Sequence, residues 1–394
     1  MKGASVTVEW RAWGIAASLC LAAVAAGAAG GEADGFALGE KETIVFTGDS
    51  ITAAGHYVRY VEAYLRTRFP ERTFRVVAAG RRSETLSGLT EPNHPGPRPT
   101  LFERFERDVA AHAPTWIVAG YGMNDGIYHP WSDERFGCYQ QGVGQLAARA
   151  KALGSRLLLL TPPAWDRAGR GDLSLAPGES HSYKKPFPEY DAVLRRYSDW
   201  LMSLDTPGLQ VADVHAAFRG HLDARREAEP AFKLQRDSIH PDETGHLLIA
   251  MAVLQAWNAP ALVSEGTFDA KGERRLSFSW TPRLPMPVDA KWDASSVAAE
   301  RFTERFNRLR LSVSGLPAGS YRLSADGAAV GVYTAEALAE GIDLSNAPAF
   351  PAAARSREVL EALRGARPDD AALALSCRPR PIALAVEPAA GGHP

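Results

Sequence analysis

The chain has 394 residues, 44 Lys and Arg against 46 Asp and Glu, and a formal net charge of −2. This near-neutral balance argues against nucleic acid as the main partner, because phosphate binding requires a concentrated basic surface. Apolar residues make up 45% and charged residues 23%, which is typical of a folded chain with a substantial core. The length allows about two domains, and we expect the function to lie in a pocket.

The first 31 residues are typical of a secretory signal peptide. Lys2 and Arg11 form a weakly positive start, and residues 12–31 carry no charge. An Ala-Gly-Ala step at residues 26–28 suits a cleavage site. An uncleaved membrane anchor is the alternative, since the uncharged run approaches the ~20 residues that span a bilayer. Its Ala- and Gly-rich second half favours cleavage, so we expect a secreted or periplasmic protein without stable membrane insertion.

Export would leave two cysteines, Cys138 and Cys377, in the mature chain. They could form one disulfide bridge in an oxidising compartment or remain unpaired, and we favour two free thiols. No pair of cysteines has CxxC spacing, which excludes a cysteine-based zinc site.

Short apolar runs alternate with helical patterns after a polar linker at residues 32–42. Together they predict an α/β domain over residues 43–258, with a five-stranded parallel sheet covered by helices on both faces. Ligands bind such sheets beyond the carboxyl ends of the strands. The predicted strands are 43–47, 74–79, 115–120, 156–161 and 209–213, and the predicted helices are 57–68, 101–112, 138–153, 190–204 and 241–257.

The pattern changes after residue 258. Short strands are predicted at 275–280, 309–313, 321–325 and 329–333, with helices at 334–340 and 352–364. An Asp-Gly pair between two of these strands is a strong hairpin signal. We therefore expect a smaller α+β accessory region over residues 269–377, followed by a Pro-, Ala- and Gly-rich disordered tail at 378–394.

The first candidate catalytic residue is Ser50, in the segment Gly48-Asp49-Ser50 at the end of the first predicted strand. A serine at this turn faces a helix N-terminus, whose dipole favours a developing negative charge. The alternative is an ordinary turn with a helix-capping serine. The chain contains no Gly-x-Ser-x-Gly segment, which argues against the α/β-hydrolase fold.

The second candidate pair is Asp237 and His240, just before the last helix of the α/β domain. A serine hydroxyl attacks poorly until a base such as imidazole removes its proton. The imidazole in turn needs a carboxylate to fix its tautomer. Pro241 disfavours helical geometry at His240, so the histidine should lie on a loop. An Asp-capped helix with an incidental histidine is the alternative.

Two further segments could supply an oxyanion hole. Gly80 follows the second predicted strand, and Asn124 follows the third. With the Ser50 backbone amide they would make three donors, and one such donor is typically worth ~3 kcal/mol of transition-state stabilisation. Asp125 is expected to brace the Asn124 loop.

In combination, these segments resemble those of the SGNH hydrolase superfamily, the GDSL-type esterases and acylhydrolases. Ser50 matches the first block, Gly80 the second, Gly-x-Asn-Asp at residues 122–125 the third, and Asp237-x-x-His240 the last. The resemblance covers about residues 43–257. It implies a three-layer α/β/α flavodoxin-like sandwich and ester hydrolysis at a Ser50–His240–Asp237 triad, with no metal or other cofactor.

The substrate is indicated by a long loop at residues 161–189, which carries Trp165 among Gly and Pro residues. Long loops are commonly functional, and aromatic rings suit stacking on sugars. Arg81 lies near the expected pocket and is a second candidate substrate contact. These features favour a carbohydrate O-acetyl esterase acting on a small-molecule or polysaccharide ester, although the aromatic rings could instead pack the loop on its own domain.

Two alternatives remain for the function. One is a lysophospholipase- or thioesterase-type acylhydrolase, which would differ in its preference for acyl chain length. The other is a non-catalytic carbohydrate-binding surface protein on the same fold, which would show no turnover. The oligomeric state is left open.

A metal-free serine mechanism predicts that esterase activity survives prolonged chelator treatment. The sequence has no three converging His, Asp or Glu residues at ligand spacing, whereas a serine mechanism needs only a neutral imidazole. Acetate release from an aryl acetate, measured before and after dialysis against a chelator, checks this. Activity that disappears and returns with added zinc or manganese would indicate a metal-dependent deacetylase instead.

Overall fold

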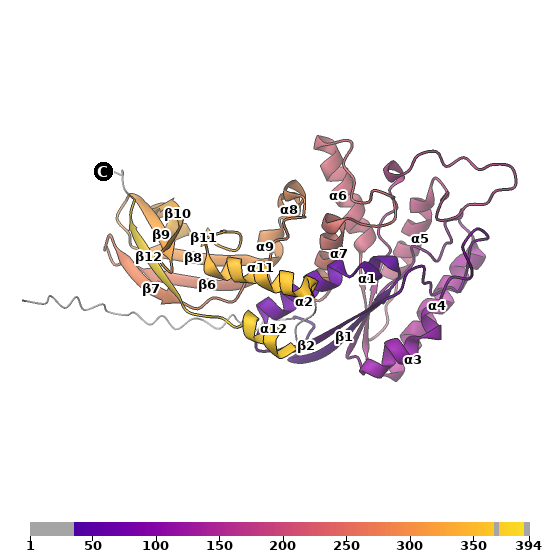
Figure 1. Ribbon diagram of the computed structural model, residues 1–394, viewed down its shortest axis with the longest axis horizontal. Coiled ribbons are helices and arrows are strands. Elements are labelled where there is room, and N and C mark those ends of the chain that lie inside the picture. The colour runs from indigo at the N-terminus through magenta and orange to yellow at the C-terminus, as the bar shows by residue number, and fades with distance from the viewer. Residues whose placement is uncertain (1–34, 366–369, 390–394) are drawn as a thin grey trace, which may run out of the picture.

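A computed structural model describes residues 35–365 and 370–389, in which an α/β domain is followed by a β-rich C-terminal region (Figure 1). The expected signal peptide lies outside the described residues. The α/β domain contains a five-stranded sheet in the order β2-β1-β3-β4-β5, and every pairing in it is parallel. The expected α/β fold is confirmed, with β1 (Lys41–Gly48), β2 (Thr73–Gly80), β3 (Trp116–Gly120), β4 (Arg156–Leu160) and β5 (Leu209–Ala212).

Helices cover both faces of this sheet because alternate strand residues point to opposite sides. Along β3, Trp116 and Val118 enter one core, whereas Ile117 and Ala119 enter the other. The first core is covered by α1 (Ser50–Ala54), α2 (His56–Arg68), α6 (Val214–Ala228) and α7 (Glu243–Ala256). The second is covered by α3 (Phe105–Asp108), α4 (Asp133–Ala152) and α5 (Tyr190–Met202).

In the α/β domain, one predicted helix is broken into shorter elements and one long helix was not predicted. The segment 101–112 is not one helix but a short α3 between two 3-10 turns, Leu101–Glu103 and Ala110–His112. Arg104 separates the first turn from α3, and its buried side chain reaches Glu84 and the Ala79 carbonyl under the sheet edge. The second difference is α6, which the sequence analysis missed although Asp213 caps it by accepting from the Ala216 amide.

The C-terminal region consists of two sheets with a few helices. A four-stranded sheet has the order β10-β9-β12-β7, and a three-stranded sheet has the order β11-β8-β6. The strands are β6 (Leu262–Asp269), β7 (Leu276–Trp280), β8 (Arg308–Ser314), β9 (Ser320–Ala325), β10 (Ala328–Thr334), β11 (Ile342–Asp343) and β12 (Ile382–Pro388). The helices are α8 (Ala294–Ala299), α9 (Phe302–Phe306), α10 (Ala335–Glu340), α11 (Pro351–Arg364) and α12 (Asp370–Cys377).

Three expected boundaries are corrected by these elements. The expected disordered tail at 378–394 contains β12, a central strand whose Ile382, Leu384 and Val386 are buried; prolines and alanines around these residues hid their alternation. β6 begins before residue 269. The expected linker 32–42 overlaps β1, and in its described part, residues 35–42, the Ala37 amide donates to the Trp257 carbonyl, so this part packs on the domain.

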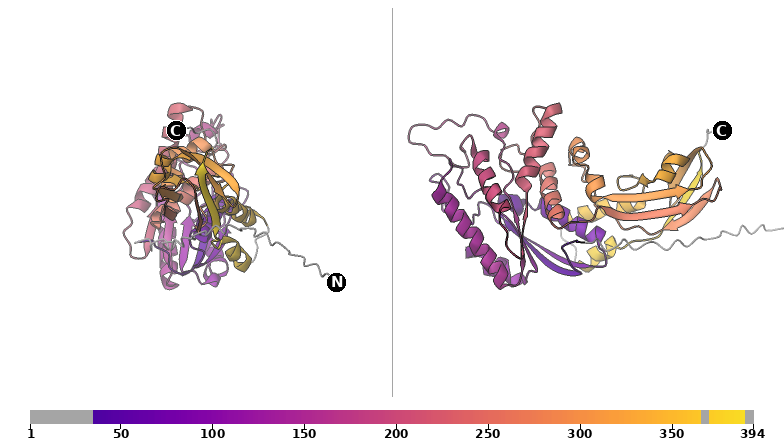
Figure 2. Two further views of the ribbon diagram at one scale, coloured as in Figure 1. Left: turned by 90° about the vertical axis from the view of Figure 1, so that its left-hand side faces the viewer. Right: turned by 180° about the vertical axis from the view of Figure 1, so that it is seen from behind.

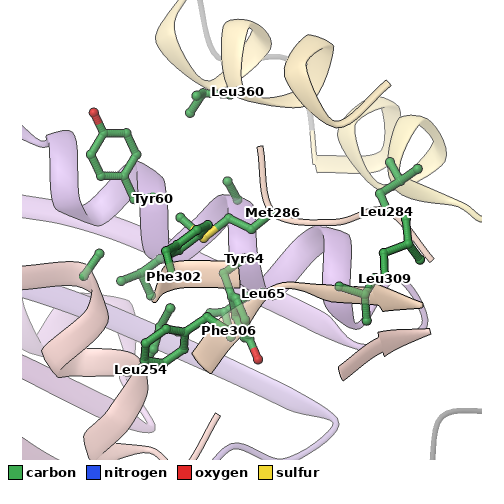
Figure 3. Close-up of a cluster of buried hydrophobic side chains, with 14 of the residues drawn as sticks. Tyr60, Tyr64, Leu65, Leu254, Leu284, Met286, Phe302, Phe306, Leu309 and Leu360 are labelled. Carbon is green, nitrogen blue, oxygen red and sulfur yellow. The ribbon is translucent and has the colours of Figure 1, made fainter. Parts of the chain in front are cut away.

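The two parts of the chain share one hydrophobic core. Figure 3 shows Tyr60, Tyr64 and Leu65 of α2 facing Met286 and aromatic rings of the C-terminal region. In Figures 1 and 2 the strands of that region extend away from the α/β domain, and α11 lies alongside α2. The C-terminal region is therefore packed onto the back of α2 rather than joined by a free linker.

A buried arginine adds polar bonds to this junction. Arg68, at the end of α2, is 1% exposed. Its guanidinium donates to the carbonyls of Pro260, Leu262 and Phe306 at 2.6–2.7 Å. These carbonyls belong to the start of the C-terminal region and to the end of α9, so one side chain ties three backbone segments together.

Cys138 on α4 and Cys377 at the end of α12 are both free thiols, as expected. Among the helices in residues 35–365 and 370–389, none has the length and apolarity that crossing a membrane requires.

Arg68→Met should destabilise the whole chain by about 2–4 kcal/mol, because it leaves three buried carbonyls without their charged donor. The measurement is the free energy of unfolding in urea. Arg275→Gln is the control, since Arg275 is exposed and its surface pair with Glu387 should contribute less than about 1 kcal/mol. Equal effects of the two substitutions would show that Arg68 does not stabilise the junction.

Candidate active site

Ser50 lies where β1 passes directly into α1. Asp49 caps this short helix by accepting a hydrogen bond from the Ile51 amide at 2.9 Å, and the serine side chain is half-buried. A Cβ atom on Gly48 would lie 2.2 Å from Thr52 Oγ1 and 2.6 Å from the Gly120 carbonyl oxygen. Only glycine therefore permits so abrupt a turn at this point.

The structure brings Ser50, His240 and Asp237 together. Ser50 Oγ lies 2.9 Å from His240 Nε2, and His240 Nδ1 lies 2.6 Å from Asp237 Oδ2. An ionised carboxylate can only accept hydrogen bonds, so Nδ1 carries the proton and Nε2 is free to accept from the serine hydroxyl. This is the tautomer that a general base requires.

The loop that carries His240 is held in place by its own carboxylate and by a neighbouring turn. Asp237 Oδ1 accepts from the backbone amides of Ile239 and His240 at 3.0 and 2.7 Å. Ser238 between them has a φ of 69°. A Cβ on Gly169 would meet the Ser238 amide at 2.6 Å, so the long loop after β4 presses directly on this segment.

The two charged members of the triad shift each other's titration. The hydrogen bond to Asp237 raises the pKa of His240 above its ordinary value, against the opposing effect of burial. Burial would raise the pKa of Asp237, but the hydrogen bonds from the His240 ring and from the loop amides outweigh it and hold that pKa well below its ordinary value. The ionised form of Asp237 is therefore favoured at neutral pH.

Asp49 is a second titratable group near Ser50. Its carboxyl is buried, and burial raises its pKa to about 7, while the bond from the Ile51 amide and the charge of His240 act in the opposite direction. In the sequence, Asp49 is recognisable only as part of the turn at Ser50. A buried carboxyl at a helix cap is not distinguishable in sequence from an exposed one.

Asn124 lies buried on the loop after β3, with its amide orientation fixed by its neighbours. Its Oδ1 accepts from the Tyr128 hydroxyl at 2.7 Å, and its Nδ2 donates to the Glu84 carbonyl at 3.2 Å. One hydrogen of Nδ2 remains for a further acceptor. Asp125 accepts from the amides of Leu86, Ser87 and Gly122 at 2.8–2.9 Å, so it braces this loop as expected.

Gly80 is placed differently from what an oxyanion donor needs. The Arg81 amide donates to the Gly48 carbonyl, and successive amides of a strand point to opposite sides. The Gly80 amide therefore points away from β1, which leads to Ser50. A Cβ on Gly80 would lie 2.3 Å from the Ala53 amide nitrogen, so this glycine serves the close packing of α1 on β2.

The turn at Arg82 and Ser83, just after Gly80, has backbone amides without hydrogen-bond acceptors among the described residues. Ser83 has a φ of 64°, a conformation that costs energy for a residue other than glycine and often marks functional sites. Within the described residues, neither the Arg82 amide nor the Ser83 amide donates to a protein group. No sequence signal at a serine could have indicated this conformation.

The two candidate substrate contacts, Trp165 and Arg81, differ in their exposure to solvent. Trp165 is 1% exposed and packs in the second core, so its ring cannot stack on a sugar; the alternative that loop aromatics pack on their own domain is the correct one for this residue. Arg81 is exposed, and its guanidinium lies 3.9 Å from Glu103. Glu84, three positions further along the chain, is buried and pairs with Arg104.

No metal site is evident in the part of the chain that the structure describes. There, no three His, Cys, Asp or Glu side chains lie close enough together to hold an ion. His215, which follows β5, instead contacts Asp191 at 3.2 Å.

Comparison with known proteins decides the family. The model of the GDSL-like lipase/acylhydrolase family matches residues 46–248, just over half of the chain. The chain belongs to this family. The resemblance to SGNH hydrolases is confirmed, and the protein is an ester-bond hydrolase.

Individual relatives cover the chain to different extents. An acetylxylan esterase from Geobacillus stearothermophilus is 26% identical over 244 residues, which are 55% of this chain and 94% of that protein. A crystal structure of an acetylxylan esterase from the same organism is 24% identical and covers 56% of this chain and 96% of that one, with a TM-score of 0.39. The structure of a gut microbial diltiazem-metabolizing enzyme, 18% identical, covers 89% and 98% with a TM-score of 0.74. The last likeness shows that the fold extends into the C-terminal region.

The pH dependence of this hydrolase should follow from the raised pKa of His240. The imidazole must be neutral to accept a proton, so kcat/KM should fall as the pH drops through an apparent pKa above the ordinary ~6.5 of histidine. The measurement is kcat/KM for an aryl acetate over a range of pH. In the control Asp49→Asn, which keeps an acceptor for the Ile51 amide, the value should stay above 6.5, because Asp237 is the main cause. An apparent pKa below that of free histidine would contradict the assignment.

Proposed function

We propose that this GDSL-family hydrolase is an exported serine esterase that removes acetyl groups from a carbohydrate through an acyl-enzyme at Ser50. The observation that carries the proposal is the continuous hydrogen-bonded chain from Ser50 Oγ through the His240 ring to Asp237, at 2.9 and 2.6 Å. The first 31 residues, with their charged start and uncharged apolar middle, support export.

The proposed reaction has two halves that use the same imidazole. Ser50 Oγ attacks the ester carbonyl carbon while its proton passes to His240 Nε2, and the tetrahedral intermediate collapses as that proton passes to the departing alkoxide. Water then attacks the acetyl-serine, again losing a proton to His240. Release of acetate returns the proton to Ser50. Throughout, ionised Asp237 stabilises the positive imidazolium.

The negative charge on the intermediate requires donors at fixed positions. The Ser50 amide, at the first position of α1, and the free hydrogen of Asn124 Nδ2 are two such donors. For the third we favour the turn at Ser83 over Gly80, because the Gly80 amide points to the outer edge of the sheet whereas the Ser83 amide has no partner among the described residues.

The choice of an acetylated carbohydrate rests on the relative rather than on the aromatic loop. The acetylxylan esterase is similar to 55% of this chain over 94% of its own length, and the buried Trp165 removes the stacking argument. A small acyl group and a sugar alcohol are therefore the first substrates to test.

Ser50→Ala should lower kcat for acetate release by at least about 10³-fold and leave the fold unchanged, because the half-buried hydroxyl adds little packing. His240→Ala should lose about as much, since residues that act as one unit are not additive. The measurement is acetate release from acetylated xylooligosaccharides, with circular dichroism as the control for folding. Wild-type activity in folded Ser50→Ala would refute the acyl-enzyme.

Asn124→Ala should lower kcat by about 10²–10³-fold with a smaller change in KM, because its donor bonds most strongly to charge that develops in the transition state. Tyr128→Phe is the matched variant: it removes the bond to Asn124 Oδ1 while the amide stays in place, and should cost less than Asn124→Ala. A large rise in KM at constant kcat would make Asn124 a ground-state binding residue.

A further inference from the structure

Two exposed arginines flank the triad without partners of their own. Arg82 and Arg236 are both exposed, and neither makes a hydrogen bond or an ion pair with any residue that the structure describes. Most other arginines near the site are committed: Arg98 pairs with Glu91 at 2.6 Å, and Arg104 pairs with Glu84. The chain as a whole has a net charge of −2, so attraction of an anion to the site must come from cations that lie close to it.

Arg82 is placed by the sheet on the Ser50 side of the site. The preceding residue, Arg81, donates its amide to the Gly48 carbonyl at 2.8 Å, and Gly48 stands two positions before Ser50. Arg82 then enters the turn with Ser83, at the carboxyl end of the edge strand β2. Its charge is close enough to His240 to lower the pKa of that imidazole slightly.

Arg236 is placed on the other side by the loop of the catalytic histidine. Gln235 and Pro241 form an isolated antiparallel bridge, so Arg236 follows the bridge on one arm and His240 precedes it on the other. Residues opposite each other in an antiparallel pair point to the same face. Gln235 is buried, whereas Arg236 and His240 are both exposed, in accordance with this alternation.

The acidic groups around these arginines do not cancel them. Asp237 is engaged by His240 and two amides. Asp242, the carboxylate whose titration Arg236 affects, is occupied as the α7 cap by the Gly245 amide. Glu243 pairs with Lys291 at 3.2 Å. The open edge of the site therefore presents guanidinium groups, which match the planar geometry of a carboxylate.

We propose that Arg82 and Arg236 are specificity residues that bind a carboxylate on the sugar carrying the ester, so that the preferred substrate is an acetylated uronic acid rather than a neutral acetylated sugar. This rests on the proposed function, because it names the substrate class of the same triad. The arginines attract and orient the anion, and the ester bond is broken by the steps already described.

The test compares two acetate esters that differ only at C6, an acetylated methyl glucuronoside with a carboxylate there and the corresponding methyl glucoside with a neutral hydroxymethyl group. Acetate release is followed at a pH above the titration of His240, where loss of the Arg82 charge no longer alters the neutral imidazole fraction. The wild type should favour the glucuronoside in kcat/KM, and the preference should shrink in high salt, which screens exposed charges. Arg82→Gln and Arg236→Gln should each reduce the preference by about 3- to 10-fold, mainly through KM.

Arg195→Gln is the matched control, since Arg195 is also an exposed arginine, on α5, and its ion pair within the described residues is with Asp199; it should leave the preference unchanged. Hydrolysis of both esters at equal rates would overturn the inference and leave the proposed function intact. Equal losses on both esters in the two variants would also overturn it, because the arginines would then act on the triad and not on the substrate's charge. Hydrolysis of neither ester by the wild type would overturn the inference and the proposed function together.

Discussion

The close approach of three strand ends is the constraint on which the site depends. Gly48 pairs with Gly80 on one side and with Gly120 on the other, so three glycines stand in a row at the carboxyl edge of the sheet. The first turn of α1 presses onto two of them at distances that exclude a side chain. Because α1 begins at Ser50, the depth of this packing fixes where the nucleophile stands relative to the loops that follow β2 and β3.

The second constraint is the loop from residue 235 to residue 241, which carries His240. This histidine is 190 positions after Ser50 in the chain. The loop holds its shape through Asp237, whose two oxygens serve the backbone and the imidazole separately. The same carboxylate therefore builds the loop and orients the base. Such double use explains why both residues lie within one short turn.

The sequence was enough to predict which residues come together where this depends on residue type and on a place beside a strand end or a helix start. Ser50, Asp237, His240 and Asn124 each follow a strand or open a helix, and the structure places the first three within hydrogen-bonding distance of their partners. The sequence was not enough where the outcome depends on tertiary packing. Whether Trp165 faces a substrate or the core, and which way the Gly80 amide points, are decided by neighbours that the local pattern does not contain. β12 was missed because alanines stand between its buried residues and obscure their alternation, and because its strand partners lie far away in sequence.

The burial of α2 has a consequence for how the family diversifies. Most residues of α2 are buried, both on the face toward the sheet and on the face toward the C-terminal region. Arg68, the last residue of the helix, is also buried. A family member without such a C-terminal region needs polar side chains on the outer face of the equivalent helix. Loss or gain of the C-terminal region by recombination would therefore require many substitutions on the outer face of this helix. An apolar outer face on the helix equivalent to α2 identifies chains that carry such a region.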